Sequence, residues 1–110
     1  MDNNMDTIDL IDEVNNFITY IQSHLVFQRI FRLNINLYTQ ILQRTNNRKF
    51  ITAYSLFKKR IIEEGYLINV TDGEIINLSA NKIWRSLTPV EKSVFHTYAT
   101  QIRSILDIRN

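Results

Sequence analysis

The side chains in this sequence that are best suited to surface chemistry are two clusters of cations, Arg-Lys at 48–49 and Lys-Lys-Arg at 58–60. Residues 46–110 hold ten basic and six acidic side chains, whereas residues 1–45 hold three basic and five acidic ones. Clustered cations of this kind neutralise the phosphates of a polyanion. The pattern favours a polyanionic partner for residues 46–110, and an ordinary solvated helical face is the alternative.

Groups that perform catalysis or hold a metal are scarce. The chain contains no cysteine, and its two histidines, His24 and His96, lie far apart in the sequence. Glu63 and Glu64 are neighbours, and neighbouring residues on a helix point in different directions. With 2 glycines in the chain, a glycine-rich phosphate-binding loop is also ruled out. We therefore expect a binding protein rather than an enzyme, with no metal and no other cofactor.

The elements that position these residues are expected to be helices. In a chain of 110 residues, 2 glycines and 1 proline are too few for turn-rich β-structure. Apolar residues recur at spacings of three and four, the period of an amphipathic helix. The pattern predicts helices at residues 7–25, 27–42, 52–64 and 72–85 and from residue 88 toward the C-terminus, with a turn at 45–47 and Gly65 as a helix stop. Within 27–42, the alternation of apolar residues and asparagine at 33–37 leaves an extended strand as the alternative.

The turn at 45–47 divides the chain into two predicted parts. Residues 1–45 form an N-terminal helical extension, and residues 46–110 form the main unit. The apolar stripe within residues 8–25 either packs on that unit or pairs with a helix of a protein partner. No apolar run approaches the ~18 residues that cross a bilayer, and the acidic N-terminus differs from a signal peptide, so we expect an intracellular protein.

The clearest helix start is the run Thr88-Pro89-Val90-Glu91. It has the pattern of a capping box, in which the Thr hydroxyl and the Glu carboxylate each bind a backbone N–H that the helix leaves unpaired. Proline at the first helical position is already in helical geometry. The last helix is therefore expected to begin at this point.

Three stretches in residues 48–106 resemble the high-mobility-group (HMG) box. The first is Ala-Tyr-Ser-Leu-Phe at 53–57, followed by the basic residues 58–60. The second runs from Ile76 through Trp84 and a basic residue, and the third is residues 88–99, with its Glu-Lys pair, its aromatic residue and its alanine. The three stretches occur in the family's order, and they are most similar to fungal mating-type HMG proteins.

The resemblance implies an all-α fold: an L-shaped three-helix HMG box over residues 46–110, preceded by the N-terminal helical segment. The first two helices of the box would form a short arm. The third would pair with the extended segment at about residues 46–52 to form the long arm. The aromatic cluster at the corner would consist of Tyr54, Phe57, Trp84 and Phe95.

The resemblance also implies that the box binds the minor groove of double-stranded DNA, preferably bent or distorted, and kinks it. Cations near the phosphates would be Arg48, Lys49, Lys58, Lys59 and Arg60, together with Lys82 and Arg85, although Lys59 and Arg60 cannot both face the wall that Lys49 faces. Groove contacts would come from Thr52, Tyr54, Ser55 and Asn77.

The sequence departs from the family at the residue that would unstack a base step. The family often has Ile, Met or Phe there, whereas this chain has Ser55, and Val70 is the candidate for a second wedge. The chain also stops without a basic tail. We therefore expect modest affinity with strong salt dependence, with a slope of log K against log salt of about −3.5 for roughly four neutralised phosphates.

The expected function is thus minor-groove DNA binding and bending in the nucleus. The expected role is transcription regulation, as in fungal mating-type proteins. The alternative is a helical protein–protein interaction module that keeps the HMG fold and binds DNA weakly or not at all. The absent wedge, the absent tail and the acidic residues 1–45 favour this alternative.

Overall fold

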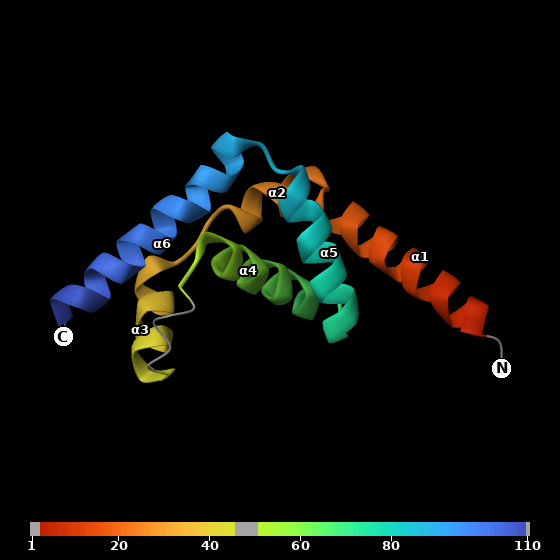
Figure 1. The fold of residues 1–110 in the computed structure, drawn as a ribbon, viewed down its shortest axis with the longest axis horizontal. Helices are drawn as coiled ribbons and strands as arrows, with labels where there is room; N and C mark the ends of the chain where they lie inside the picture. The colour runs from red at the N-terminus through yellow and green to blue at the C-terminus, as the bar shows by residue number, and fades with distance from the viewer. Residues whose placement is uncertain (1–2, 46–50, 110) are drawn as a thin grey trace.

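The computed structural model describes residues 3–45 and 51–109 (Figure 1). All regular secondary structure in these ranges is helical, which confirms the all-α class. None of the described helices is long and apolar enough to cross a membrane. The helices are α1 (Asn3–Ile21), α2 (His24–Ile30), α3 (Ile35–Thr45), α4 (Ala53–Leu67), α5 (Gly73–Ser86) and α6 (Pro89–Arg109).

The starts of the last three helices are set by local side-chain hydrogen bonds. Ahead of α6, the Glu91 carboxylate accepts from the Thr88 N–H at 2.8 Å, and the Thr88 hydroxyl accepts from the Glu91 N–H at 3.1 Å. This confirms the predicted capping box. The Asp72 carboxylate caps α5 by accepting from the N–H groups of residues 74 and 75. These caps bind amides that the helices cannot satisfy themselves.

The first two predicted helices have different boundaries in the structure. The first begins at Asn3 rather than at residue 7, and the second is divided into α2 and α3. The helix predicted at 7–25 ends at Ile21, because the Ser23 hydroxyl donates to the Tyr20 carbonyl and Ser23 adopts an extended backbone before α2. The helix predicted at 27–42 is interrupted between α2 and α3, where the Asn34 side chain accepts from the Leu37 N–H. Short polar side chains compete with the helix for backbone hydrogen bonds. The turn predicted at 45–47 lies mostly outside the described residues.

Gly65 is not the helix stop that its residue type predicted. It lies buried inside α4, which continues to Leu67. A Cβ atom at position 65 would lie 2.5 Å from the Val70 carbonyl oxygen. The Val70 N–H donates to the Gly65 carbonyl at 2.8 Å, and Asn69 takes the positive φ of 62° that completes the turn. Glycine is therefore required at position 65, because the α4–α5 loop brings the Val70 carbonyl back to α4 where a Cβ atom would lie.

Helix α4 lies at the centre of the molecule, in contact with α5, α6 and α2. In Figure 1, α5 and α6 diverge from the short connection between them, and α4 lies beneath it. The N-terminal helices pack on the outside of α4, α5 and α6: α1 packs on α5, α2 on α4, and α3 on α6. Their buried residues, such as Phe17, Ile21 and Ile30, belong to the same apolar cluster as those of α4–α6. The stripe of residues 8–25 is thus used only in part inside the molecule, because Val14 and Ile21 are buried whereas Ile11 and Leu25 are exposed.

Aromatic rings fill the junction of α4, α5 and α6. Phe57 is fully buried, and its ring centroid lies 5.2 Å from that of Trp84 and 5.5 Å from that of Phe95. Tyr54 meets Trp84 edge to face at 5.7 Å. The predicted cluster of four rings is therefore confirmed. Phe31, from the α2–α3 connection, extends it by contacting Phe95 at 5.4 Å.

The extended residues just before α4 pack against α6. Ile51 is buried, and its carbonyl accepts a hydrogen bond from the Arg103 guanidinium at 2.8 Å. This places at least the end of the predicted 46–52 segment beside the last helix. The remainder of that segment lies outside the described residues.

A buried carboxylate joins the N-terminal helices to α4. The Glu64 side chain is 2% exposed and accepts two hydrogen bonds from Arg29, at 2.9 and 2.5 Å. Arg60 and the Tyr20 hydroxyl approach the same carboxylate, at 3.4 and 3.5 Å. The hydrogen bonds from Arg29 hold the pKa of Glu64 below its ordinary value, and burial opposes them.

This cluster predicts acid sensitivity. Because the pKa of Glu64 is lowered by folding, its contribution to stability is present above the pKa of the unfolded chain and is lost as the pH falls through the folded value. We expect the wild type to lose stability between about pH 5 and pH 3 by more than a Glu64→Gln variant does. Urea unfolding at several pH values measures this. Equal pH dependence of the two proteins would contradict it.

Candidate nucleic-acid interface

A hydrogen bond from Tyr54 links the exposed sides of α4 and α5. The Tyr54 hydroxyl donates to the Asn81 side-chain oxygen on α5. Burial raises the pKa of Tyr54, and the nearby charge of Arg85 lowers it in part. Asn81 and Arg85 therefore lie beside Tyr54, on the side of α5 that is turned away from the core.

Helical spacing extends this junction along both helices. Lys58 lies one turn after Tyr54 on α4, and Asn77 lies one turn before Asn81 on α5. Lys59, Asn77, Lys82 and Arg85 are exposed, and Lys58 is half-buried. We call this surface the α4–α5 face, defined by Tyr54, Lys58, Asn77, Asn81, Lys82 and Arg85, with Lys59 at its edge toward α3.

The cations of the α4–α5 face carry uncompensated charge. Among the described residues, the ion pairs found are Arg29 with Glu64 and Arg60 with Glu63 and Glu64. Lys58, Lys59, Lys82 and Arg85 take part in none of them. Within the part of the chain that the structure describes, these cations therefore have no carboxylate partner, and unpaired surface cations in general attract anions.

Arg60 does not belong to this face. Its guanidinium is largely buried and donates to the carbonyls of Arg29 and Ile30, at 2.8 and 3.3 Å, as well as to Glu63 at 2.6 Å. The prediction that Arg60 lies near phosphates is therefore wrong, because the group is used to hold α2 against α4. The expectation about Lys59, Arg60 and the wall that Lys49 faces stays a prediction, because Lys49 lies outside the described residues.

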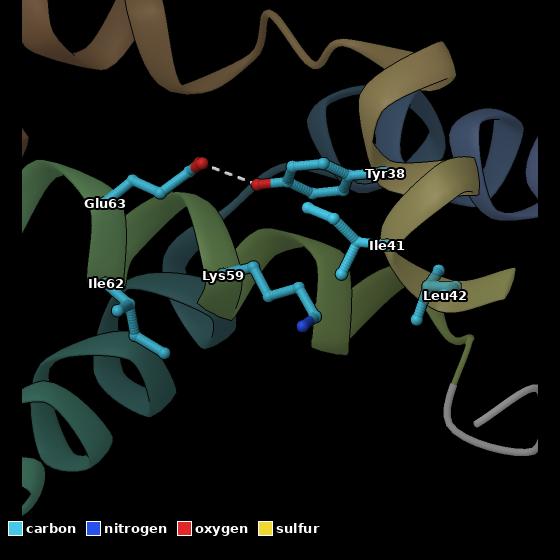
Figure 2. A pocket seen from close by; sticks show the side chains of 6 residues that line it. All are labelled: Tyr38, Ile41, Leu42, Lys59, Ile62 and Glu63. Carbon is cyan, nitrogen blue, oxygen red and sulfur yellow. Dashed lines mark hydrogen bonds between the residues drawn. The ribbon is translucent and has the colours of Figure 1, made fainter. Parts of the chain in front are cut away.

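Lys59 lies at the edge of the α4–α5 face, where a groove of about 210 Å³ separates α4 from α3 (Figure 2). Tyr38 and Glu63 close one end of this groove with a 2.6 Å hydrogen bond. Burial, followed by the Glu63 carboxylate, raises the pKa of Tyr38. In Figure 2 the Lys59 side chain runs between the helices with its amine away from that bond. The Lys59 ammonium therefore forms no ion pair with Glu63, the carboxylate that lines the same groove.

Thr52 and Ser55 use their hydroxyls within the chain. The Thr52 hydroxyl accepts from the Ser55 N–H at 3.1 Å, and the Ser55 hydroxyl accepts from the Thr52 N–H at 3.0 Å. Their side chains thus form the capping box of α4. A contact between these hydroxyls and a DNA groove would compete with their hydrogen bonds in the helix cap. Val70, the second wedge candidate, is half-buried against the core.

Arg48 and Lys49 lie outside the described residues. Sequence reasoning did not single out Asn81, although it follows Asn77 by one helical turn and faces Tyr54. It also placed no role on Lys92, whose ammonium lies 5.7 Å from the centre of the Trp84 ring. Both residues stand on helices that were correctly predicted, but their partners come from other helices.

Within residues 3–45 and 51–109, no group of three His, Asp or Glu side chains lies close enough together to hold a metal. No protein-family model matches the chain, and neither the curated proteins nor the solved structures contain a match.

Proposed function

We propose that this protein binds double-stranded DNA through the α4–α5 face. The observation that carries the proposal is the set of four cations, Lys58, Lys59, Lys82 and Arg85, that are free of ion pairs with the described residues. They flank the polar groups of Tyr54, Asn77 and Asn81 on two adjoining helices. Cations would bind phosphates, and the amides would reach base edges.

The proposed mode is that of an HMG box in its L-shaped form, with the face in the minor groove of bent or distorted DNA. The ring cluster around Trp84 and the segment before α4 that packs on α6 support this assignment. Asn side chains in the minor groove would chiefly separate A·T from G·C pairs. Transcription regulation in the nucleus, of the fungal mating-type kind, is the role that follows, and the proposal assigns binding rather than catalysis.

The test is a fluorescence titration of bent and straight DNA duplexes at several salt concentrations. For the wild type, four phosphate contacts predict a slope of log K against log salt of about −3.5. The double variant Lys58→Ala/Arg85→Ala is expected to bind about tenfold more weakly and to flatten the slope by about 2. Arg32→Ala is the charge-matched control for the single variant Lys58→Ala, since Arg32 is exposed between α2 and α3 and is not one of the residues of this face.

A slope near zero for the wild type would contradict a phosphate-binding face. So would equal losses in the Arg32 variant and in a single Lys58→Ala variant, because binding would then follow net charge rather than the position of the cations. Tighter binding to bent than to straight duplexes supports the minor-groove mode.

The second candidate function is a protein-interaction module with the same fold. It is favoured by Thr52 and Ser55, because their hydroxyls are used in the helix cap and neither residue supplies an apolar wedge. In this case a protein partner would bind at residues 8–25, which include most of α1 and the start of α2. Chemical-shift changes around Ile11 with a protein, and none with DNA, would favour it.

A further inference from the structure

A second surface adjoins the α4–α5 face on its α1 side. A groove of about 430 Å³ runs between α1 and α5, and its apolar lining comes from Leu10, Ile11, Val14 and Leu78. Val14 is buried, but Ile11 is 53% exposed and Leu78 is 45% exposed. Within the described residues, these two aliphatic side chains therefore face each other across an uncovered groove.

The polar rim of this groove is positive. Lys82 and Arg85 line it from α5, next to the amides of Asn15 and Asn81, and the lining residues that the structure describes include no carboxylate. The groove on another side of α1 has the opposite character, because Glu13 and Asp72 line it. The apolar floor with a cationic rim is thus a property of this groove and not of the surface of α1 in general.

We propose that the α1–α5 groove binds an amphipathic helix of a protein partner, one that carries aliphatic residues on one face and carboxylates beside them. Two packed helices present ridges between which a third helix packs its side chains. Ile11 and Leu78 would contact the aliphatic face of that helix. Its carboxylates would pair with Lys82 and Arg85, the two cations that no described carboxylate neutralises.

The shared cations couple this site to the proposed DNA face. Lys82 and Arg85 belong to both surfaces, whereas Ile11 and Leu78 belong only to the groove and Lys58 only to the α4–α5 face. A bound acidic helix would therefore compete with DNA. The proposal itself does not require DNA binding, because the groove and its rim exist without it.

The experiment is selection of helical peptides from a random display library against the full chain, followed by anisotropy titration of the enriched peptides. We expect enriched sequences to have apolar residues at helical spacing and a net negative charge. Ile11→Gln and Leu78→Gln should each weaken peptide binding by about tenfold. Leu25→Gln is the matched control, because Leu25 is 72% exposed on α2, outside the groove. Thermal unfolding checks that all variants fold.

Three results would overturn the proposal: no enrichment, enrichment without acidic residues, or enriched peptides that bind the Ile11 variant as well as the wild type. A dimer of this chain that Ile11→Gln disperses in sedimentation would also overturn it, in favour of a second copy in the groove. Lys58→Ala distinguishes the two functions, since it should weaken DNA binding and leave peptide binding unchanged. Failure of either function can thus be recognised separately.

Discussion

Replacement of Phe57 by alanine is expected to lower the free energy of unfolding by about 4 kcal/mol. The ring is fully buried and lies between those of Trp84 and Phe95, so its removal leaves a cavity at the junction of α4, α5 and α6. Three helices meet at this point, and they cannot all move inward to fill the space. Urea unfolding followed by circular dichroism measures the loss.

The matched control is Tyr66→Ala on the same helix. Tyr66 is an aromatic residue of similar size that is 64% exposed, so its replacement is expected to change stability by about 0.5 kcal/mol or less. If the two variants lost similar stability, the ring junction would not be the packing centre of the molecule. A Phe57→Leu variant, which keeps most of the apolar volume, should lose less than Phe57→Ala.

Replacement of Glu64 by alanine is expected to lower the free energy of unfolding by about 3 kcal/mol. The carboxylate is 2% exposed, and its removal takes away the acceptor of two hydrogen bonds from Arg29 and leaves a void beside the Arg60 guanidinium, which is 12% exposed and keeps its bonds to Glu63 and to the carbonyls of α2. Arg29 is 46% exposed and can turn toward water, which limits the loss. The same substitution separates α1 and α2 from α4, because Tyr20 and Arg29 both meet this group. Differential scanning calorimetry and hydrogen exchange measure the two effects.

Glu63→Ala is the adjacent control. The Glu63 side chain is 45% exposed, and it binds Arg60 and the Tyr38 hydroxyl at the surface, so a loss of about 1 kcal/mol is expected. Hydrogen exchange should show faster opening of α1 and α2 in the Glu64 variant but not in the Glu63 variant. A Glu64 variant whose N-terminal helices stay as protected as those of the wild type would disprove this linking role.

The three C-terminal helices could be predicted from the sequence because their signals are local. Asp72 and the Thr88–Glu91 pair bind amides within three residues of themselves, so each helix start is determined by its own neighbours. The apolar period of α5 likewise places Ile76, Ala80 and Ile83 on one buried face. The ring cluster, in contrast, was expected from the resemblance to the HMG box and not from the periodicity of any one helix.

The N-terminal helices were predicted less well because two influences compete there. The apolar pattern continues through Ser23 and Asn34, but both side chains form hydrogen bonds that interrupt the helix. Gly65 was misread for a different reason. Its role depends on the return of Val70 across α4, which is a contact between backbone segments that no local pattern reveals.

The site shows the same division between local and distant causes. Lys58, Lys59 and Arg60 are equivalent as a basic run, yet Arg60 is turned toward the carbonyls of α2 and the carboxylate of Glu64. Asn81 is assigned to the α4–α5 face because its side chain accepts a hydrogen bond from Tyr54 on the other helix. Pairing of a charged group depends on partners that are distant in the chain, so it cannot be inferred from the run itself.

Local signals in the sequence account for the helical class of this protein and for the starts of α4, α5 and α6. These features depend on helical periodicity and on caps that act over three or four residues. Three other features depend on tertiary contacts. They are the lack of ion pairs at some described cations, the need for glycine at position 65, and the apolar groove with a positive rim between α1 and α5. These features arise where side chains distant in the chain meet, and the geometry of helix packing brings them together.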